Sequence, residues 1–95
     1  MRILLAEDEP VLADQIKSVM KTEGRVVDIA RNGVDAQHLA ETEPYDLIIL
    51  DLGVPERDGI TVLRSLRTGK VDTPVLILTA RGDWSDRVDG LDAGA

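Results

Sequence analysis

The chain of 95 residues has no cysteine and no phenylalanine, and Tyr45 and Trp84 are its only aromatic residues. Without cysteine, neither a disulfide framework nor a thiolate metal site can form, which fits a reducing compartment. Because aromatic residues are so few, the core must be built from aliphatic side chains. With 43% hydrophobic and 31% charged residues, the composition is that of an ordinary globular protein, and the length predicts one domain spanning residues 1–95.

Clusters of basic residues and long apolar runs are also missing. The chain has 11 basic and 18 acidic residues and a net charge of −7. Because phosphate contacts need clustered lysine and arginine, we do not expect this segment to bind nucleic acid. No apolar run approaches the roughly 20 residues of a membrane span, and the chain begins directly with a strand pattern. We therefore expect no signal peptide, no membrane segment and a cytoplasmic location.

Short apolar runs indicate where the strands lie. Leu47 to Leu50 are four consecutive apolar residues between two aspartates, which is typical of a strand buried on both faces of a parallel sheet. Comparable runs predict further strands at Arg2–Ala6, Arg25–Ala30 and Pro74–Ala80.

Segments with helical spacing of apolar residues separate these strands. Between Pro10 and Gly24, apolar side chains recur at positions typical of an amphipathic helix. They are Leu12, Ile16, Val19 and Met20. Further helices are expected at about Val34–Thr42, at about Ile60–Thr68, and from a cap at Asp83 or Ser85 to Gly94. This alternation predicts the α/β class, with a doubly wound parallel sheet and right-handed crossovers.

Acidic side chains follow two of the predicted strands. Asp51 ends the strand of residues 47–50, and Glu7, Asp8 and Glu9 follow the first strand. If these strands are neighbours, the carboxylates lie a few ångströms apart, where two like charges repel by roughly 4 kcal/mol at 4 Å and an effective dielectric of about 20. Raised pKa values could offset that repulsion, but a hard divalent cation such as Mg²⁺ does so more effectively.

Asp51 also has a simpler interpretation. An aspartate at a junction between strand and loop often only accepts hydrogen bonds from nearby N–H groups of a turn or a helix cap. In an open α/β sheet, however, ligands bind outside the carboxyl ends of the strands, where Asp51 stands. Taken alone, the residue leaves both interpretations open, and the second acidic cluster favours a binding site.

These features together resemble the receiver domain of a bacterial two-component response regulator, over residues 1 to 95. The loop pattern of that family, Asp-Leu-x-x-Pro-x-x-Asp-Gly, is matched by Asp51, Leu52, Pro55, Asp58 and Gly59. The resemblance implies a CheY-like, flavodoxin-like (βα)5 fold that lacks its last βα unit in this chain.

The resemblance also implies a role for each site residue. Glu7 and Asp8 would hold Mg²⁺ together with Asp51, and the backbone carbonyl of Gly53 would complete the metal site. Asp51 would accept a phosphoryl group from a sensor histidine kinase. The hydroxyl of Thr79, at the end of the fourth strand, would act as the switch that senses the phosphoryl group.

A narrower resemblance lies near the end of the sequence. Ala80-Arg81 and the run from Asp86 to Ala95 are similar to the OmpR/PhoB subfamily, whose receivers are joined to a winged-helix DNA-binding domain. Membership would imply that DNA is bound only through a C-terminal domain absent from this chain. It would also imply a homodimer and a role in transcription regulation. The simpler interpretation of Arg81 and Arg87 is surface charge.

The sequence departs from the family in two respects. A receiver has a fifth strand and helix, and the family's lysine after that strand has no counterpart here, since Lys70 precedes the fourth strand. We therefore expect the natural protein to continue past Ala95, or else the sheet edge to be covered by an edge-paired or swapped dimer. Gly53 offers no side chain to screen the phosphoryl group, which suggests a short-lived phosphoaspartate.

Two other functions are compatible with parts of this pattern. One is a Mg²⁺-dependent phosphohydrolase with Asp51 as nucleophile, but such enzymes commonly carry a second aspartate two residues later, where this chain has Gly53. The other is an interaction module that binds no phosphoryl group and uses its carboxylates as loop caps. The receiver interpretation implies no enzymatic turnover beyond gain and loss of its own phosphoryl group.

Overall fold

Strands and helices alternate through the part of the chain that the computed structural model describes, which is residues 1–51, 53–54 and 56–78. The elements are β1 Arg2–Ala6, α1 Pro10–Thr22, β2 Val26–Ala30, α2 Gly33–Thr42, β3 Leu47–Asp51, α3 Gly59–Thr68 and β4 Val75–Leu78. The α/β prediction is confirmed. The expected last helix and the end of the expected strand at 74–80 lie outside the described residues.

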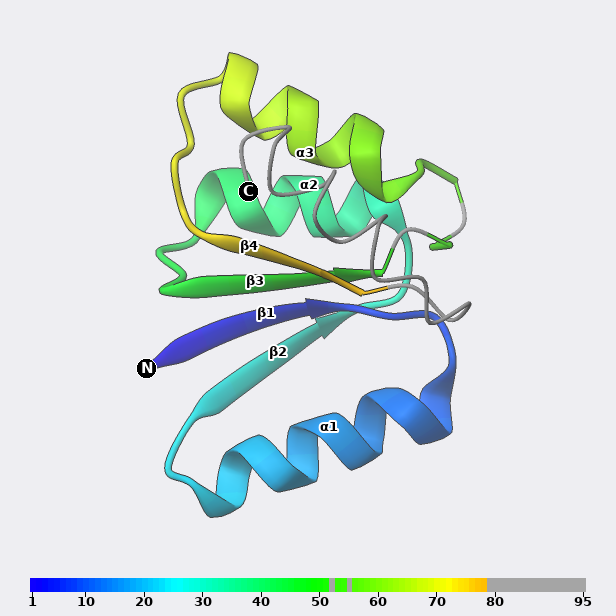
Figure 1. Cartoon of the computed structure of the whole chain (residues 1–95), viewed down its shortest axis with the longest axis vertical. Helices are drawn as coiled ribbons and strands as arrows, with labels where there is room; N and C mark the ends of the chain where they lie inside the picture. Colours follow the sequence, from blue (N-terminus) through cyan, green and yellow to red (C-terminus); the bar gives the residue numbers. More distant parts are fainter. Residues whose placement is uncertain (52, 55, 79–95) are drawn as a thin grey trace.

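The four strands form one parallel sheet in the order β2-β1-β3-β4. All four arrows point the same way in Figure 1. In the register, Ala6 lies opposite both Ala30 of β2 and Leu50 of β3, and Asp51 lies opposite Leu78 of β4. Because β1 and β3 are neighbours, the acidic residues that follow them meet at one edge of the sheet.

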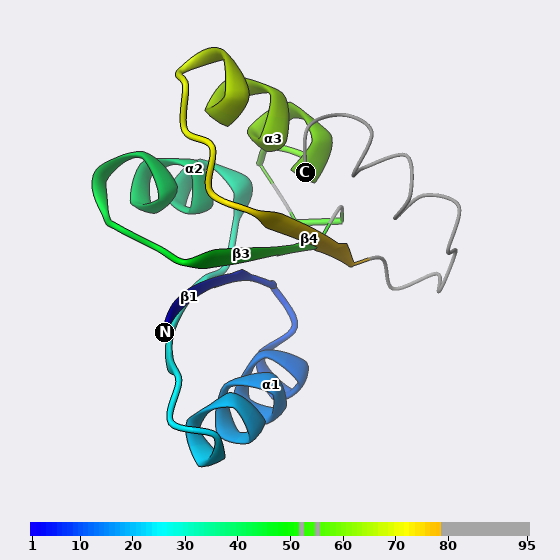
Figure 2. The same cartoon turned by 60° about the vertical axis from the view of Figure 1, so that its left-hand side comes forward.

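Helices cover both faces of the sheet, as the doubly wound prediction requires. Helix α1 lies on one face, and α2 and α3 lie on the other (Figures 1 and 2). Alternate strand residues point to opposite faces: Leu4 and Ile48 belong to the cluster under α2 and α3, and Ile3 and Ile49 belong to the cluster under α1. These side chains are almost fully buried, and each contributes about 1.5–3 kcal/mol through the hydrophobic effect.

Helix α1 packs through only part of the predicted apolar stripe: Ile16 and Met20 contact the core, and Leu12 and Val19 do not. Leu12 and Val19 remain 40% and 59% exposed, whereas Ala13 is fully buried. Ala13, Ile16 and Met20 are three and four residues apart, so they share one face and contact the sheet cluster beneath α1. The small Ala13 side chain lets the helix backbone approach the sheet. None of the helices in the described ranges is both long enough and apolar enough to cross a membrane.

The helices α1, α2 and α3 of the described part of the chain begin at the carboxyl edge of the sheet and carry a side-chain cap there. Asn32 caps α2, because its Oδ1 accepts the N–H of Asp35 at 2.7 Å. Asp58 caps α3 by accepting both the N–H and the hydroxyl of Thr61, at 3.0 and 2.8 Å. Such caps satisfy backbone donors that a helix leaves free, and they fix where the preceding loop ends.

Candidate functional site

Three carboxyl groups meet where β1 and β3 end. Glu7, Asp8 and Asp51 each offer one oxygen, and these oxygens all lie within 4.8 Å of one another. Glu7 and Asp51 are only 5% and 6% exposed, whereas Asp8 faces solvent. The strand order therefore brings together the acidic residues that the sequence placed at two separate strand ends.

Asp51 is the last residue of β3 rather than the first residue of the loop. Its Oδ1 accepts the N–H of Gly53 at 3.2 Å, so the interpretation as a turn residue holds for one oxygen. The carboxylate also contributes an oxygen to the acidic cluster. A local turn bond and a binding role therefore coexist in the same side chain.

Glu7 is held by the backbone on both sides. Its N–H donates to the carbonyl of Ala30 at 3.0 Å, which continues the pairing of β1 with β2 by one residue. Its Oε1 accepts the N–H of Glu9 at 3.1 Å. The side chain is thereby directed into the cluster instead of into solvent.

Glu9 has a different role from its two acidic neighbours, which the sequence reasoning missed. Its carboxylate accepts the N–H groups of Val11 and Leu12, at 3.2 and 2.6 Å, and so caps α1. The available signal was Pro10, which favours the first helical position and makes the residue before it the cap. The acidic run therefore divides into two carboxylates at the site and one at the helix.

The cluster carries charge that no described cation offsets. Burial is the main reason that the pKa of Glu7 is raised from its ordinary 4.5 to about 6, and the neighbouring Asp51 and Asp8 raise it further, whereas the Glu9 N–H acts in the opposite direction. Within the described ranges, the ion pairs formed by arginine, lysine and histidine do not include Glu7, Asp8 or Asp51. This arrangement favours the binding of a cation.

The donor set fits a hard divalent cation. All three side chains supply carboxylate oxygens, and neither imidazole nor thiolate belongs to the cluster. Oxygen donors of this kind, with one side open to solvent at Asp8, suit Mg²⁺, which retains several water molecules when proteins bind it. A carboxylate beside such an ion can also attack an electrophilic phosphorus.

Gly53 lies directly beside the Asp51 carboxylate. A Cβ at position 53 would lie 3.8 and 3.9 Å from the two carboxylate oxygens, in ordinary van der Waals contact. A larger side chain there would therefore cover one side of Asp51, and glycine leaves that side open. Of the predicted site and its loop motif, Thr79, Leu52 and Pro55 lie outside the described residues, whereas Asp58 and Gly59 form the cap and the start of α3.

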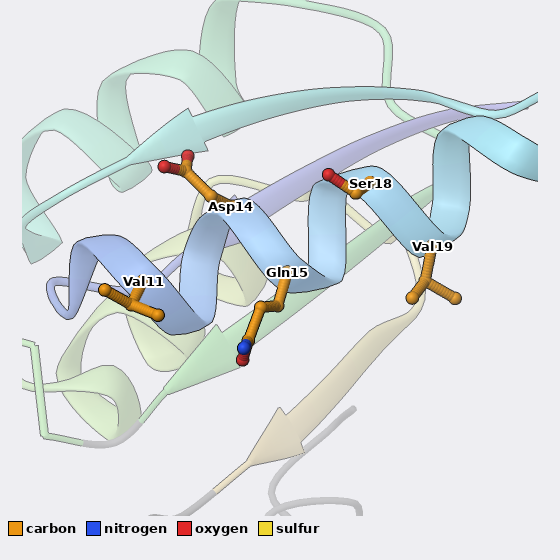
Figure 3. A pocket seen from close by; sticks show the side chains of 5 residues that line it. All are labelled: Val11, Asp14, Gln15, Ser18 and Val19. Atoms are coloured by element: carbon orange, nitrogen blue, oxygen red, sulfur yellow. The ribbon is translucent and has the colours of Figure 1, made fainter.

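A shallow hollow elsewhere on the surface contains none of the predicted site residues. It measures about 630 Å³ and lies along α1, between Val11, Asp14, Gln15, Ser18 and Val19. Val11, Gln15 and Val19 lie along one side of the helix and Asp14 and Ser18 along the other (Figure 3). Asp14 is its one titratable side chain, so it offers no cluster of reacting groups comparable to the strand ends.

Known proteins are similar to this chain over its whole length. The "Response regulator receiver domain" family matches residues 3–95. The response regulator protein PmrA of Pseudomonas aeruginosa is 48% identical over 95 residues, which are 100% of this chain and 43% of PmrA. The transcriptional activator protein IrlR of Burkholderia pseudomallei is 50% identical over 95 residues, again 100% of this chain and 41% of IrlR. The chain thus spans about two fifths of these curated relatives.

The fold is similar to solved receiver domains as well. One is the receiver domain of the sensor histidine kinase PA1611 from Pseudomonas aeruginosa, with a magnesium ion coordinated in the active site cleft. Its TM-score is 0.85 at 34% identity, and the match covers 98% of this chain and 78% of the PA1611 chain. The curated relatives PmrA and IrlR are a response regulator and a transcriptional activator.

Proposed function

This chain belongs to the response regulator receiver domain family, and from that premise we propose that it is the phosphoacceptor switch of a two-component system. The observation that carries the proposal is the meeting of Glu7, Asp8 and Asp51 at the ends of β1 and β3. In this role Asp51 accepts a phosphoryl group from a sensor histidine kinase, and Glu7 and Asp8 hold a metal ion beside it.

Mg²⁺ is the ion best suited to this site. The carboxylate donors support it, as do the cluster's charge, which no cation in the described part of the chain offsets, and the magnesium ion in the PA1611 receiver domain. Bound Mg²⁺ would offset the negative charge that develops on the transferred phosphoryl oxygens. Glu7, Asp8 and Asp51 are the side chains that would hold it, and the backbone carbonyl of Gly53 is the proposed fourth protein ligand.

The transfer itself needs one nucleophile. A carboxylate oxygen of Asp51 forms a bond to phosphorus while the P–N bond of the donor phosphohistidine breaks, and the electron pair returns to the imidazole nitrogen. Burial of Asp51 keeps its carboxylate in a fixed orientation for this attack. The proposed switch, Thr79, then donates a hydrogen bond from its hydroxyl to the new phosphoryl group.

The output is expected to lie in a part of the protein beyond this chain. Among the curated relatives, IrlR is a transcriptional activator of which this chain matches 41%. We propose that phosphorylation of Asp51 controls a C-terminal DNA-binding domain, with a homodimer as the active state. The net charge of −7 supports DNA contacts outside this segment rather than within it.

Intact mass spectrometry tests the acceptor. The wild-type chain is incubated with acetyl phosphate and Mg²⁺, beside Asp51→Asn and beside a longer protein that contains the fifth strand and helix of a receiver. One added phosphoryl mass on the wild type and none on Asp51→Asn supports the proposal. Addition to the longer protein alone would mark this chain as an incomplete receiver, and addition to neither would overturn the proposal.

Two further measurements separate the two other functions. Continued hydrolysis of a phosphomonoester over many turnovers would favour a phosphohydrolase. An interaction module predicts no Mg²⁺ binding, and a titration followed by Trp84 fluorescence tests that directly.

The lifetime of the phosphoaspartate tests the role of Gly53. Because an asparagine side chain would cover one side of Asp51, we expect Gly53→Asn to lose its phosphoryl group more slowly than the wild type. Loss of the added mass over time measures both rates. A phosphoaspartate that lives as long in the wild type as in Gly53→Asn, or longer, would rule out this role of Gly53.

A further inference from the structure

The loop that follows Asp51 rests on the first turn of α2. A Cβ added to Gly33 would overlap the carbonyl oxygen of Arg57 and would lie 2.7 and 2.8 Å from its carbonyl carbon and its Cβ. The first two of these atoms belong to the backbone, so they cannot move aside as the end of a flexible side chain can. The absence of a side chain at Gly33 is therefore what allows the loop to lie against α2.

A side-chain contact also holds Arg57 against α2, one helical turn beyond Gly33. The Arg57 guanidinium donates a hydrogen bond to Oε1 of Gln37. Gly33 and Gln37 are four residues apart, so they lie on the same face of α2. Figure 1 shows that α2 and α3 both begin at the carboxyl edge of the sheet, the edge at which β3 ends.

Two further anchors hold the loop on either side of Arg57. The Val54 side chain is 5% exposed and belongs to the core cluster under α2 and α3. Asp58 caps α3 through its two bonds to Thr61. Between them, Glu56 has a φ of 70°, a conformation that non-glycine residues adopt only when the surroundings hold them there. The loop is thus fixed at Val54, Arg57 and Asp58.

We propose that Gly33 and Gln37 of α2 are positioning residues for the phosphoacceptor site, and that they act by holding the loop so that Gly53 stays beside Asp51. The inference rests on the proposed function, because it assigns these residues to the proposed metal site. Neither residue belongs to the acidic cluster. Partners that orient metal ligands from outside the ligand set typically change metal affinity about 10- to 100-fold when they are removed.

The first test is Gly33→Ala, with Gly69→Ala as the matched control. Gly69 has a φ of −79° as the C-cap of α3, and a Cβ there would lie 3.5 Å from the Ser65 carbonyl oxygen, so alanine fits. Isothermal titration with Mg²⁺ measures the affinity of each variant. We expect Kd to rise at least roughly tenfold in Gly33→Ala and to stay close to the wild-type value in Gly69→Ala.

Gln37 gives a milder test that leaves the backbone untouched. Gln37→Leu removes the acceptor of the Arg57 hydrogen bond, whereas Gln37→Glu keeps an acceptor. Weaker Mg²⁺ binding in Gln37→Leu, with binding restored in Gln37→Glu, supports the positioning role. If the leucine variant binds Mg²⁺ as the wild type does, this contact plays no part in positioning.

Hydrogen exchange in the absence of Mg²⁺ gives a readout that does not depend on metal. We expect faster exchange at the amides of residues 53, 54 and 56–58 in Gly33→Ala, and unchanged exchange at these amides in the Gly69→Ala control, where the added Cβ fits. A lower Tm for Gly33→Ala with unchanged Mg²⁺ affinity would show a purely structural role and overturn the inference. Unchanged exchange in the loop would overturn it as well.

Failure of the proposed function looks different. A wild-type protein that neither binds Mg²⁺ nor accepts a phosphoryl group would remove the phosphoacceptor role, whatever the variants do.

Discussion

The two ends of the sheet both gather acidic side chains, but they treat the charge in opposite ways. At the end where the strands begin, the Arg2 guanidinium and the Tyr45 hydroxyl both donate to the carboxylate of Asp28 in β2, at 3.1 and 2.8 Å. At the other end, Glu7 and Asp51 are buried together without a described cation. The first arrangement holds strands together. The second leaves negative charge that a bound cation can neutralise.

The paired end is a small network around the β1, β2 and β3 starts. The Arg2 guanidinium lies 5.0 Å from the centre of the Tyr45 ring and 3.6 Å from Glu43. The Tyr45 hydrogen bond and the Arg2 pair hold the pKa of Asp28 below its ordinary value. Burial, together with the bond to Asp28, raises the pKa of Tyr45 to about 12. Each group is stabilised in the charge state that it has at neutral pH.

The largest difference between the two ends should appear when Mg²⁺ is added. At a Mg²⁺ concentration a hundred times its Kd, binding to the native state alone raises the free energy of unfolding by about 2.7 kcal/mol. We expect this increment in the wild type and in Asp28→Asn, and its loss in Asp51→Asn. Thermal unfolding with Mg²⁺ or with a chelator measures it. Equal increments in wild type and Asp51→Asn would place the bound ion elsewhere.

The pH dependence of the metal-free protein should come next in size. Because the pKa of Glu7 is about 6 in the fold and about 4.5 when unfolded, the native state holds the extra proton between these values. Glu7 therefore costs no stability below about pH 4.5 and destabilises the fold increasingly as the pH rises to about 6, by about 2 kcal/mol in total. Denaturant titrations of wild type and Glu7→Gln should diverge over this range. Parallel curves would contradict the burial argument.

Removing the charge of Asp28 should destabilise the protein at neutral pH. Asp28→Asn weakens a charge-assisted pair that is partly open to water, and we expect a loss of about 1 kcal/mol in the free energy of unfolding. Asp14→Asn removes one acidic charge from the exposed side of α1 and serves as the control. If both variants lose the same amount, the network around Arg2 contributes nothing specific.

Removing the charge of Asp51 should have the smallest effect, with the opposite sign. Without metal, Asp51→Asn relieves the repulsion between Asp51 and Glu7, so we expect a gain of less than about 1 kcal/mol. Urea unfolding in the presence of a chelator measures the change. A clear loss of stability would mean that Asp51 supports the fold, as Asp28 does.

The sequence predicted most of the fold because the relevant signals are local. A run of apolar residues such as Leu47 to Leu50 indicates a strand whichever strands lie beside it, and Ile48, Ile49 and Leu50 are indeed buried. The burial of Ala13 and the exposure of Val19 were not predictable, since they depend on the direction from which the sheet meets α1. The spacing of apolar residues identifies one face of a helix, but it does not determine which residues of that face contact the sheet most closely.

For the site, the sequence supplied the residues and the structure supplied the neighbours. The acidic groups after β1 and β3 meet only if these two strands are adjacent, and the strand order establishes that they are. The partners of Asp28 were not foreseen, because Arg2 and Tyr45 lie far from it in the sequence and no local pattern links them. The role of Thr79 remains a prediction.

The position of β1 beside β3 also bears on how the chain folds. Nearly half of the chain separates Glu7 from Asp51, and the connection between them includes α1, β2 and α2. Closing such a long loop is a slow, non-local step, and until it is complete the two carboxylates stay far apart in water. The repulsion between them is therefore absent from the unfolded chain and arises only once the sheet has assembled. The carboxylates of the site thus do not oppose the early stages of folding.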